Sequence, residues 1–220
     1  GGGAEISVQS MTSTDTRDVR ATVRQARRLC AAGCEVVRIA VPDAEAASKL
    51  SKIRAALPGV PLVADIHFNH RLALASVEAG FDGLRLNPGN IGSAARVRAV
   101  VAAARARKVP IRIGVNAGSV DKKLLARFGG PTPRAMAESA MQHVRILEDA
   151  GFGEIKISVK AFDVPATVEA YRLLAARVDY PFHGGITEAG TLVPGALRSG
   201  VGLGILLYLG LADTIRVSLT

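Results

Sequence analysis

The strongest constraint on the fold is an alternation that recurs along the whole chain: a short apolar or β-branched run, a turn, and a longer run of helical period. This alternation predicts eight strands with seven helices between them. Residues typical of helix caps support the helix ends, such as the Ala-Gly pair at 32–33 and the Thr-Pro pair at 132–133. The predicted strands are residues 6–10, 35–40, 61–66, 82–87, 110–115, 154–159, 180–186 and 213–219. The predicted helices are residues 16–32, 44–56, 69–79, 93–107, 133–150, 164–177 and 191–209.

Eight β units within 220 residues favour a small α/β fold of the TIM-type (β/α)8 barrel over an open doubly wound sheet. No long polar linker interrupts the pattern, so residues 1–220 are expected to form one domain. The sequence ends at Thr220, directly after the last predicted strand. We therefore expect the last outer helix to be missing, either because the chain is a fragment of a longer protein or because another element covers the gap.

The chain is basic, with 28 Lys and Arg against 19 Asp and Glu and a formal charge of +9. Such a balance points to an acidic or phosphorylated partner. Aromatic residues make up only 4% of the chain and Trp is absent, so few side chains could stack on nucleic-acid bases. The arginines of the predicted helices 16–32 and 93–107 are expected to form a solvated outer face rather than a nucleic-acid patch.

Two cysteines, Cys30 and Cys34, are too few for a disulfide scaffold or for a four-ligand metal site. We expect them to be buried or half-buried thiols in a reducing cytoplasm. The longest apolar run, 201–212, contains glycines and is too short for a membrane span. The Gly-Gly-Gly start lacks the basic region of a signal peptide. The sequence therefore predicts a cytoplasmic protein without membrane contact.

Nearly every predicted strand ends in polar residues, although a parallel barrel strand is covered on both faces and should be apolar. Residues two apart on a strand share a face, so Asp65 is expected beside His67 and Arg85 beside Asn87. The same rule groups Arg112 with Asn116, Lys156 with Ser158 and Lys160, and Arg216 with Ser218. Together with Arg38, these side chains should point to the carboxyl-terminal mouth, where barrel enzymes keep their active sites.

Like charges that converge in a partly buried funnel repel one another unless anions complete the site. The complement we expect is a small ligand with several negative oxygens, a diphosphate held by Arg and Lys. The alternative is that the basic residues form structural ion pairs, for which only Asp65 and Glu188 lie near the same strand ends. The basic residues concerned are Arg38, Arg85, Arg112, Lys156, Lys160 and Arg216.

Three further features could take part in chemistry. Glu188 is the only carboxylate in the loop after the seventh predicted strand, so it is our candidate for proton transfer, with a structural carboxylate at a helix start as the alternative. His67 could act as an acid, a base or a phosphate donor, whereas His70 and His143 are expected at the surface or in packing. The turn 87–92 could present backbone amides to a phosphate or be an ordinary βα loop.

Eight ordered motifs, which extend over essentially the whole chain, resemble the 4-hydroxy-3-methylbut-2-enyl diphosphate synthase family. They are SVQSMT (7–12), VADIHFNHRLAL (63–74), LRLNPGNIG (84–92), RIGVNAGS (112–119), GGPTP (129–133), KISVKAFDV (156–164), GITEAG (185–190) and DTIRVSLT (213–220). The resemblance implies the same barrel fold and a diphosphate ligand.

The resemblance further implies an oxidoreductase of isoprenoid biosynthesis. Its reaction opens 2-C-methyl-D-erythritol 2,4-cyclodiphosphate reductively, with loss of water, to 4-hydroxy-3-methylbut-2-enyl diphosphate. The electrons arrive through a 4Fe-4S cluster fed by ferredoxin or flavodoxin. By motif, Glu188 and His67 are the catalytic candidates, with Glu188 positioning a hydroxyl or delivering a proton. The residues carried over to the diphosphate and its pocket are Arg38, Asp65, Arg85, Asn87, Arg112, Asn116, Lys156, Ser158, Lys160, Arg216 and Ser218.

The family also implies parts that this sequence does not contain. Its cluster is ligated by cysteines and a glutamate in a separate carboxyl-terminal domain, and Cys30 and Cys34 do not match those ligands. We therefore expect this chain to hold no metal and to be inactive alone. Family members form homodimers in which the cluster domain of one subunit closes over the barrel of the other.

Two other functions are compatible with a basic barrel. A barrel transferase of the dihydropteroate synthase type also binds a diphosphate-bearing substrate, but it needs a pterin pocket with aromatic or amide partners, and the sequence offers few. A basic module that binds nucleic acid would use the Arg-rich helices. Salt separates that module from a buried diphosphate site, because affinity for nucleic acid falls steeply with ionic strength.

Overall fold

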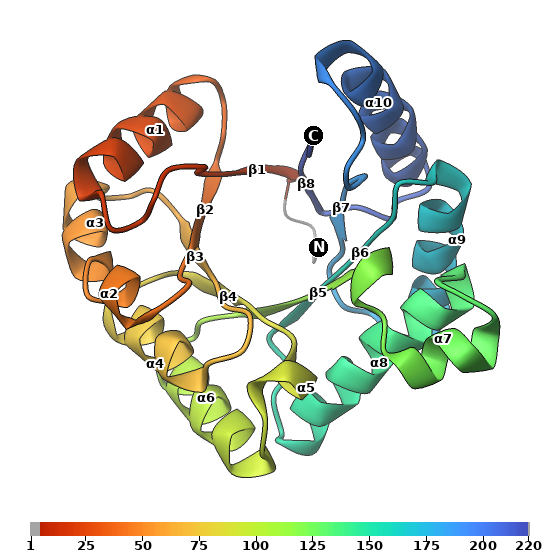
Figure 1. The fold of residues 1–220 in the computed structure, drawn as a ribbon, viewed down its shortest axis with the longest axis horizontal. Helices are drawn as coiled ribbons and strands as arrows, with labels where there is room; N and C mark the ends of the chain where they lie inside the picture. Colours follow the sequence, from red (N-terminus) through yellow and green to blue (C-terminus); the bar gives the residue numbers. More distant parts are fainter. Residues whose placement is uncertain (1–4, 220) are drawn as a thin grey trace. The chain divides into compact units, whose positions relative to one another are not determined.

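The computed structural model describes residues 5–219 and shows the predicted alternation of strands and helices (Figure 1). The strands are β1 (Ser7–Met11), β2 (Val36–Ala40), β3 (Leu62–Asp65), β4 (Gly83–Arg85), β5 (Ile111–Asn116), β6 (Ile155–Lys160), β7 (His183–Gly184) and β8 (Thr214–Ile215). The helices are α1 (Val19–Ala31), α2 (Ala44–Ala47), α3 (Leu50–Ala56), α4 (His70–Glu78), α5 (Pro88–Ile91), α6 (Ala94–Ala106), α7 (Lys122–Phe128), α8 (Pro133–Asp149), α9 (Val164–Ala175) and α10 (Leu192–Tyr208), and a short 3-10 helix is η1 (Ala117–Ser119).

The strands follow the sheet order β6-β5-β4-β3-β2-β1-β8-β7, and their paired registers are parallel. A parallel bridge between Ile157 and Phe182 joins β6 to the residues before β7, so the order returns to its start. Each strand therefore neighbours the strands that precede and follow it in the sequence, and β8 neighbours β1. This is the strand order of a (β/α)8 barrel, and it confirms the predicted fold class.

The chain divides into two compact units. The first, which we call the 8–112 unit, comprises Val8–Arg112 and Ile146–Ile155. The second, which we call the 113–220 unit, comprises Gly1–Ser7, Ile113–Arg145 and Lys156–Thr220. The pairings that link β1 through β5 lie in the 8–112 unit, and the pairing of β7 with β8 lies in the 113–220 unit.

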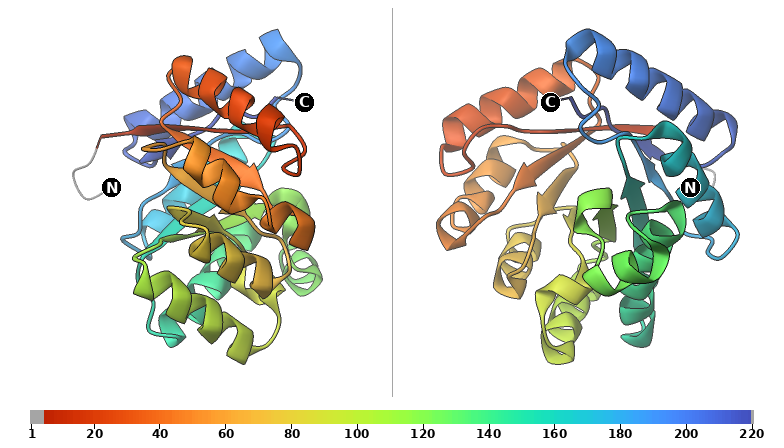
Figure 2. Two further views of the ribbon diagram at one scale, coloured as in Figure 1. Left: turned by 90° about the vertical axis from the view of Figure 1, so that its left-hand side faces the viewer. Right: turned by 45° about the vertical axis from the view of Figure 1, so that its right-hand side comes forward.

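The core of the 8–112 unit follows from strand alternation and amphipathic helices. On β2, the fully buried Val37 and Ile39 alternate with the half-buried Arg38. On α1, Val23 and Ala26 are buried, and this helix packs against β2 and α3 (Figure 2). The apolar residues therefore fill the space between strands and helices, while the polar strand residues take the other face.

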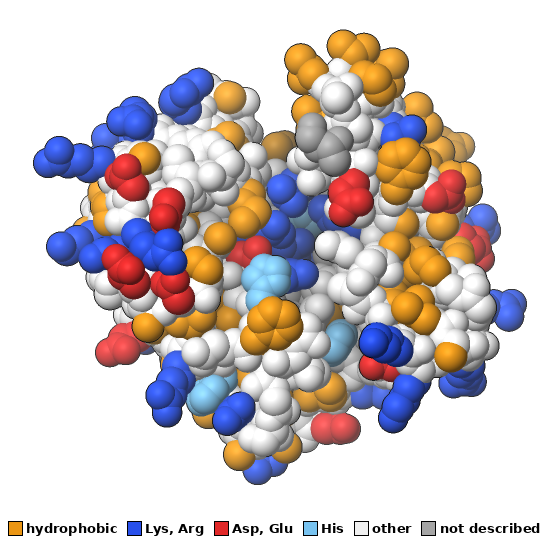
Figure 3. Space-filling view, viewed as in Figure 1, with side chains coloured by type: hydrophobic (Ala, Val, Ile, Leu, Met, Phe, Trp, Pro, Cys, Tyr) orange, Lys and Arg blue, Asp and Glu red, His pale blue; other side chains and the backbone are white. Residues whose placement is uncertain are grey.

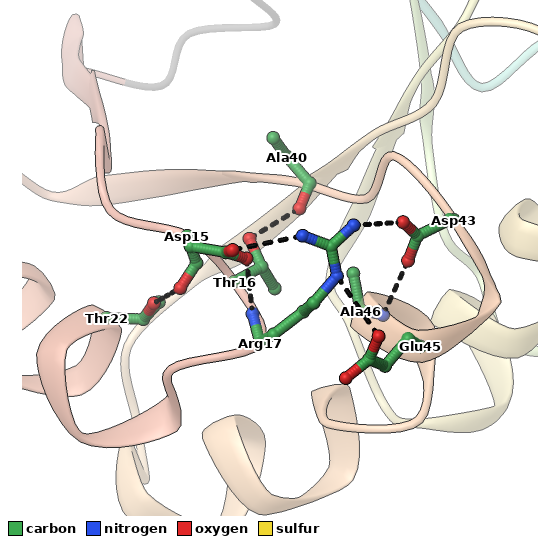
Figure 4. A network of polar contacts seen from close by, with 8 residues as sticks. All are labelled: Asp15, Thr16, Arg17, Thr22, Ala40, Asp43, Glu45 and Ala46. Carbon is green, nitrogen blue, oxygen red and sulfur yellow. Dashed lines mark hydrogen bonds and ion pairs between the residues drawn. The ribbon is translucent and has the colours of Figure 1, made fainter.

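Helix α1 begins at Val19, later than the predicted start at 16, because the preceding residues form a turn instead. The Thr16 hydroxyl donates to the Ala40 carbonyl at 2.7 Å, which ties this turn to the end of β2. Asp18 is the N-cap, and its carboxylate accepts from the backbone of the first turn. Arg17 in the same turn forms ion pairs with Asp15, Asp43 and Glu45 (Figure 4).

Other element boundaries also differ from the predicted ones. The predicted helix 44–56 is divided into α2 and α3. The segments 88–91 and 122–128 form the short helices α5 and α7, where a single helical turn or two give too little periodicity to detect. Strands β7 and β8 are shorter than the predicted 180–186 and 213–219, and Gly185, which directly follows β7, has a φ of +158°.

In the 113–220 unit, α10 packs against α9 and carries exposed apolar side chains, including Leu192, Leu197 and Tyr208. Hydrophobic side chains are visible over this helix in Figure 3. Within residues 5–219, no helix combines the length and the apolar character that a membrane crossing requires.

Candidate functional site

The 8–112 unit places a buried carboxylate among three basic side chains at the ends of neighbouring strands. Asp65, the last residue of β3, is 4% exposed. Its Oδ1 lies 3.3 Å from Nη1 of Arg85, and its Oδ2 lies 3.7 Å from Nε of Arg38. His67 follows β3, and its Nε2 lies 3.5 Å from the same Oδ2. The predicted shared face of Asp65 and His67 is therefore confirmed.

Strand register explains why these residues meet. Asp65 is the register partner of Arg85 on β4 and of Ala40 on β2. Arg38 lies two residues before Ala40 on the same strand. Consecutive parallel strands thus bring residues from distant parts of the sequence to one end of the sheet.

The environment of Asp65 keeps its carboxyl group ionised. Burial raises the pKa of this carboxyl, but the hydrogen bond from His67 and the positive charges of Arg38 and Arg85 lower it, and the net result is a pKa well below the ordinary value. A single negative charge is thus balanced against two permanently charged guanidinium groups. The structural ion pairs that the sequence offered as an alternative are therefore present at Asp65, which pairs with both Arg38 and Arg85.

Arg38 has a second contact that the sequence did not predict. Its Nε and Nη2 lie 3.1 and 2.9 Å from the Met11 sulfur, and Met11 is its register partner on β1. A thioether is a weak acceptor, so it orients the guanidinium group while offsetting little of its charge.

The remaining predicted residues of the 8–112 unit lie on β4, β5 and the turn after β4. Arg112 is 5% exposed and is the register partner of Arg85. Asn87 is 6% exposed and is the N-cap of α5, so the turn 87–92 contains a short helix. The register thus places two arginines side by side on adjacent strands, next to the cluster around Asp65.

The 113–220 unit holds the predicted lysines and serine of β6. Lys156, near the start of the strand, donates to the Thr214 hydroxyl at 2.8 Å, and that hydroxyl also bonds Ser7 at 2.9 Å. Lys160 ends β6 and is 5% exposed. Ser158 between them is buried. Lys160 thus lies at the carboxyl end of β6, where barrel enzymes have their active sites, whereas Lys156 lies near the opposite end of the strand.

Residues around β8 pack closely on Lys160. A Cβ atom added to Gly185 would lie 2.8 Å from Nζ of Lys160 and would collide with the backbone oxygen of Arg216. The backbone N–H of Arg216 donates to the Gly184 carbonyl at 3.1 Å. Only a glycine therefore fits between Lys160 and the backbone that follows β8.

Glu188 lies in the loop between β7 and α10, and its side chain is exposed. Its φ of +52° is in the left-handed region, which is uncommon for a residue with a side chain. The next residue, Ala189, donates its backbone N–H to the carbonyl of Ser218 at 3.2 Å. The loop and the predicted site residue Ser218 are therefore in direct contact.

Asn116 is exposed at the end of β5 and is used locally. Its backbone N–H donates to the Ser119 hydroxyl, which in turn donates to the Asn116 carbonyl, both at 2.9 Å. This pair closes the turn of η1. The predicted role of Asn116 in a ligand site stays a prediction.

Comparison with known proteins identifies the family. The model described as "GcpE TIM-barrel domain" matches residues 1–220. The chain belongs to the GcpE TIM-barrel family. This result confirms both the resemblance and the barrel expected from the sequence.

Two curated relatives of this GcpE barrel carry the same name. The chain is 63% identical to the "4-hydroxy-3-methylbut-2-en-1-yl diphosphate synthase (flavodoxin)" of Geobacter sulfurreducens and 62% identical to the protein of the same name from Maridesulfovibrio salexigens. Both matches cover the whole chain but only 62% and 61% of the relatives. The chain thus spans about three fifths of the length of these proteins.

Solved structures share the fold of the GcpE barrel at low sequence identity. Dihydropteroate synthase of Yersinia pestis matches with a TM-score of 0.66 and 12% identity, over 97% of this chain and 86% of that one. The enzyme of Coxiella burnetii, solved with pteroic acid, gives the same TM-score and identity over 98% and 88%. At this identity the likeness shows the fold alone.

The two cysteines of this GcpE barrel do not suit an iron-sulfur cluster. Cys30 is half-buried and Cys34 is buried, and Sγ of Cys34 donates to the Val36 carbonyl at 3.1 Å. Burial raises the pKa of the Cys34 thiol, which disfavours the thiolate that a metal needs. Across residues 5–219, no three His, Cys, Asp or Glu side chains gather in a way that could hold a metal ion.

The arginine-rich surface of the GcpE barrel lies on the outer helices of the 8–112 unit. Lys and Arg side chains are spread over α1 in Figure 3. A groove of about 640 Å³ runs between α1 and α3 and is lined by α1 arginines together with apolar residues such as Val19 and Val23. None of the predicted site residues lines it.

Proposed function

We propose that this barrel binds 2-C-methyl-D-erythritol 2,4-cyclodiphosphate and takes part in its reductive opening to 4-hydroxy-3-methylbut-2-enyl diphosphate. The names of the curated relatives support the reaction and flavodoxin as an electron donor. Ferredoxin is the other donor that the family resemblance implies. We further propose that the chain works as one domain of a cytoplasmic oxidoreductase that is a homodimer at full length.

The observation that carries the proposal is the gathering of largely buried arginines on neighbouring strands around Asp65. The side chains of Arg38 and Arg85 are both largely buried, and both lie within ion-pair distance of the Asp65 carboxylate. Arg112, buried on the next strand, adds a further positive charge. Guanidinium groups bind phosphate oxygens through paired hydrogen bonds, so three largely buried arginines on neighbouring strands suit a diphosphate.

Within this proposal the carboxylate of Asp65 does not contact the diphosphate, because two like charges would be brought together. It holds Arg38 and Arg85 instead, and His67 is the neighbouring donor to a phosphate oxygen or an acid in the reaction. Asn87, which follows β4, is a further proposed residue of the substrate pocket.

We assign the residues of the 113–220 unit by their position on the strands. Lys160 is preferred over Lys156 as a diphosphate ligand, because Lys156 is bonded to Thr214 near the start of its strand. Glu188 is assigned to proton transfer. Arg216 and Ser218, which follow β8, and Asn116 and Ser158 remain proposed substrate residues.

A pair of electrons and a pair of protons balance the reaction. The bond between a ring carbon and a diphosphate oxygen breaks, a hydroxyl group leaves as water, and the product is the linear diphosphate. The side chains of this chain bind the diphosphate while its bond to the ring carbon breaks. The carboxyl group of Glu188 holds a proton for the reaction. In the family a 4Fe-4S cluster supplies the electrons, and none of residues 5–219 forms a group that fits such a cluster.

The proposal is tested by following the cyclic diphosphate with phosphorus NMR in the full-length protein with reduced flavodoxin. We expect the signals of the cyclic substrate to be replaced by those of a linear diphosphate. The Glu188→Gln variant should still bind the substrate but form product at least roughly 100-fold more slowly, as expected when a general acid is lost. A folded, cluster-loaded protein that leaves the cyclic diphosphate unchanged would refute the proposal.

A further inference from the structure

The loop that carries Glu188 is held in a conformation that its own sequence does not favour. The φ of +52° at Glu188 is normally occupied by glycine, and a residue with a side chain keeps it only where surrounding contacts fix the backbone. The contacts around this loop therefore determine where the carboxylate lies.

Two backbone hydrogen bonds fix the peptides on either side of Glu188. Thr187 donates its N–H to the carbonyl of Ala161 at 3.3 Å, and Ala189 donates its N–H to the carbonyl of Ser218 at 3.2 Å. The acceptors follow β6 and β8, so the loop is attached to both neighbouring strand ends of the 113–220 unit.

A side chain from α10 adds a third attachment. Arg198 donates from Nη1 to the carbonyl of Ala189 at 2.5 Å, directly after Glu188. Its guanidinium carbon lies 3.8 Å from the centre of the Phe162 ring, which is a cation–π distance. Phe162 lies in the segment between β6 and α9, and 52% of it is exposed.

Within residues 5–219, Arg198 is not held in place by an ion pair. Among the described residues no carboxylate lies within ion-pair distance of Arg198. Its contacts are the Ala189 carbonyl and the face of Phe162. The guanidinium group thus bridges two loops at the ends of β6 and β7, which is where the candidate proton-transfer residue lies.

We propose that Arg198, stacked on Phe162, is a positioning residue that holds the Glu188 backbone in its left-handed conformation. This inference rests on the proposed function, in which Glu188 exchanges a proton with the substrate. Arg198 acts through the loop and makes no contact with the reacting atoms. Phe162 keeps the guanidinium plane oriented so that it can reach the Ala189 carbonyl.

The test compares three substitutions in the full-length protein. Arg198→Met keeps a long side chain but removes the donors, and Arg198→Lys keeps a donor. Arg172→Met on α9 is the matched control, because Arg172 is exposed and has no proposed role. We expect Arg198→Met to lower kcat by roughly 10- to 100-fold with KM for the cyclic diphosphate within about twofold, since misplacing a catalytic group by about 1 Å has effects of that size. Arg198→Lys should recover most of the loss, and Arg172→Met should behave as the unmodified protein.

Hydrogen exchange gives a readout that does not depend on turnover. The amide of Ala189 is bonded to Ser218, and its exchange should accelerate in Arg198→Met and remain unchanged in Arg172→Met. A double-mutant cycle with Glu188→Gln completes the test, because Arg198→Met should change the residual kcat by less than about twofold once Glu188 is gone.

The outcomes separate this inference from the proposed function. Equal losses from Arg198→Met with and without Glu188, or unchanged exchange at Ala189, would overturn the positioning role. If Glu188→Gln itself turns over like the unmodified protein, the assignment of Glu188 fails and the inference fails with it. If Glu188→Gln is inactive but Arg198→Met is fully active, the function stands and only the positioning role is wrong.

Discussion

Replacing Asp65 by Asn removes the one negative charge from the cluster while keeping the size of the side chain. The Asp65 side chain is 5% exposed, and those of Arg38 and Arg85 are 13% and 12% exposed. Little water can therefore solvate the two guanidinium groups once the carboxylate charge is removed. At an effective dielectric constant of about 20, each pair at 3.7 and 3.3 Å contributes roughly 4 to 5 kcal/mol of attraction before the cost of desolvation. Breaking a buried pair by removing one partner costs about 3–5 kcal/mol in measured cases.

We therefore expect Asp65→Asn to lower the free energy of unfolding by about 3–5 kcal/mol. The melting temperature should fall by roughly 6–20 °C, since each 1 kcal/mol shifts it by about 2–4 °C in a chain of this size. Urea denaturation monitored by circular dichroism measures the first quantity and a thermal scan the second. Asp179→Asn, an exposed carboxylate in the 113–220 unit, is the control and should have little effect.

A second arm of the same experiment tests the charge argument. Without Asp65 the cluster has one more net positive charge, so inorganic pyrophosphate should raise the melting temperature of Asp65→Asn by more than that of the unmodified protein. A destabilisation below about 0.5 kcal/mol, which is typical of surface substitutions, would refute the reasoning, as would an equal response to pyrophosphate.

Three further changes probe the pH dependence and the packing. The pKa of Asp65 lies below its ordinary value, so its stabilising effect is lost only as the pH falls from about 4 toward the depressed pKa. The difference in unfolding free energy between the unmodified protein and Asp65→Asn should therefore be larger at about pH 6 than at about pH 2. Gly185→Ala should destabilise the protein and weaken diphosphate binding in calorimetry, because the new methyl group would displace Lys160. Tyr171→Phe should lower the unfolding free energy in urea by about 1–3 kcal/mol, since the buried hydroxyl donates to the His183 carbonyl at 2.6 Å and accepts a backbone N–H at 3.1 Å.

Much of the fold could be predicted because strands and long helices have periods that extend over many residues. The alternation of buried Val37 and Ile39 with Arg38 is a signal of that kind. Short elements have no such signal, which is why α5 and α7 were not predicted. The start of α1 depends on a hydrogen bond from Thr16 to β2, and a contact between distant residues leaves no periodic pattern.

In the candidate site, too, features with a periodic sequence pattern could be predicted and features set by contacts between distant residues could not. The pairing of Asp65 with His67 follows from strand alternation alone, and the structure confirms it. The contact of Met11 with Arg38 depends on the register between β1 and β2, which the sequence does not specify. The left-handed backbone at Glu188 could not be predicted either, because contacts with other segments impose it on a residue that seldom adopts it.

The central claim is that the cationic cluster at the strand ends binds a diphosphate. Titration calorimetry of the full-length protein with the cyclic diphosphate tests it most directly, with Arg38→Ala compared against Arg24→Ala, an exposed arginine of α1. We predict saturable binding at one site, loss of affinity of at least roughly tenfold in Arg38→Ala, as for a buried charge-assisted hydrogen bond, and no change in Arg24→Ala. Binding that survives Arg38→Ala unchanged, or that both variants weaken equally, would contradict the claim.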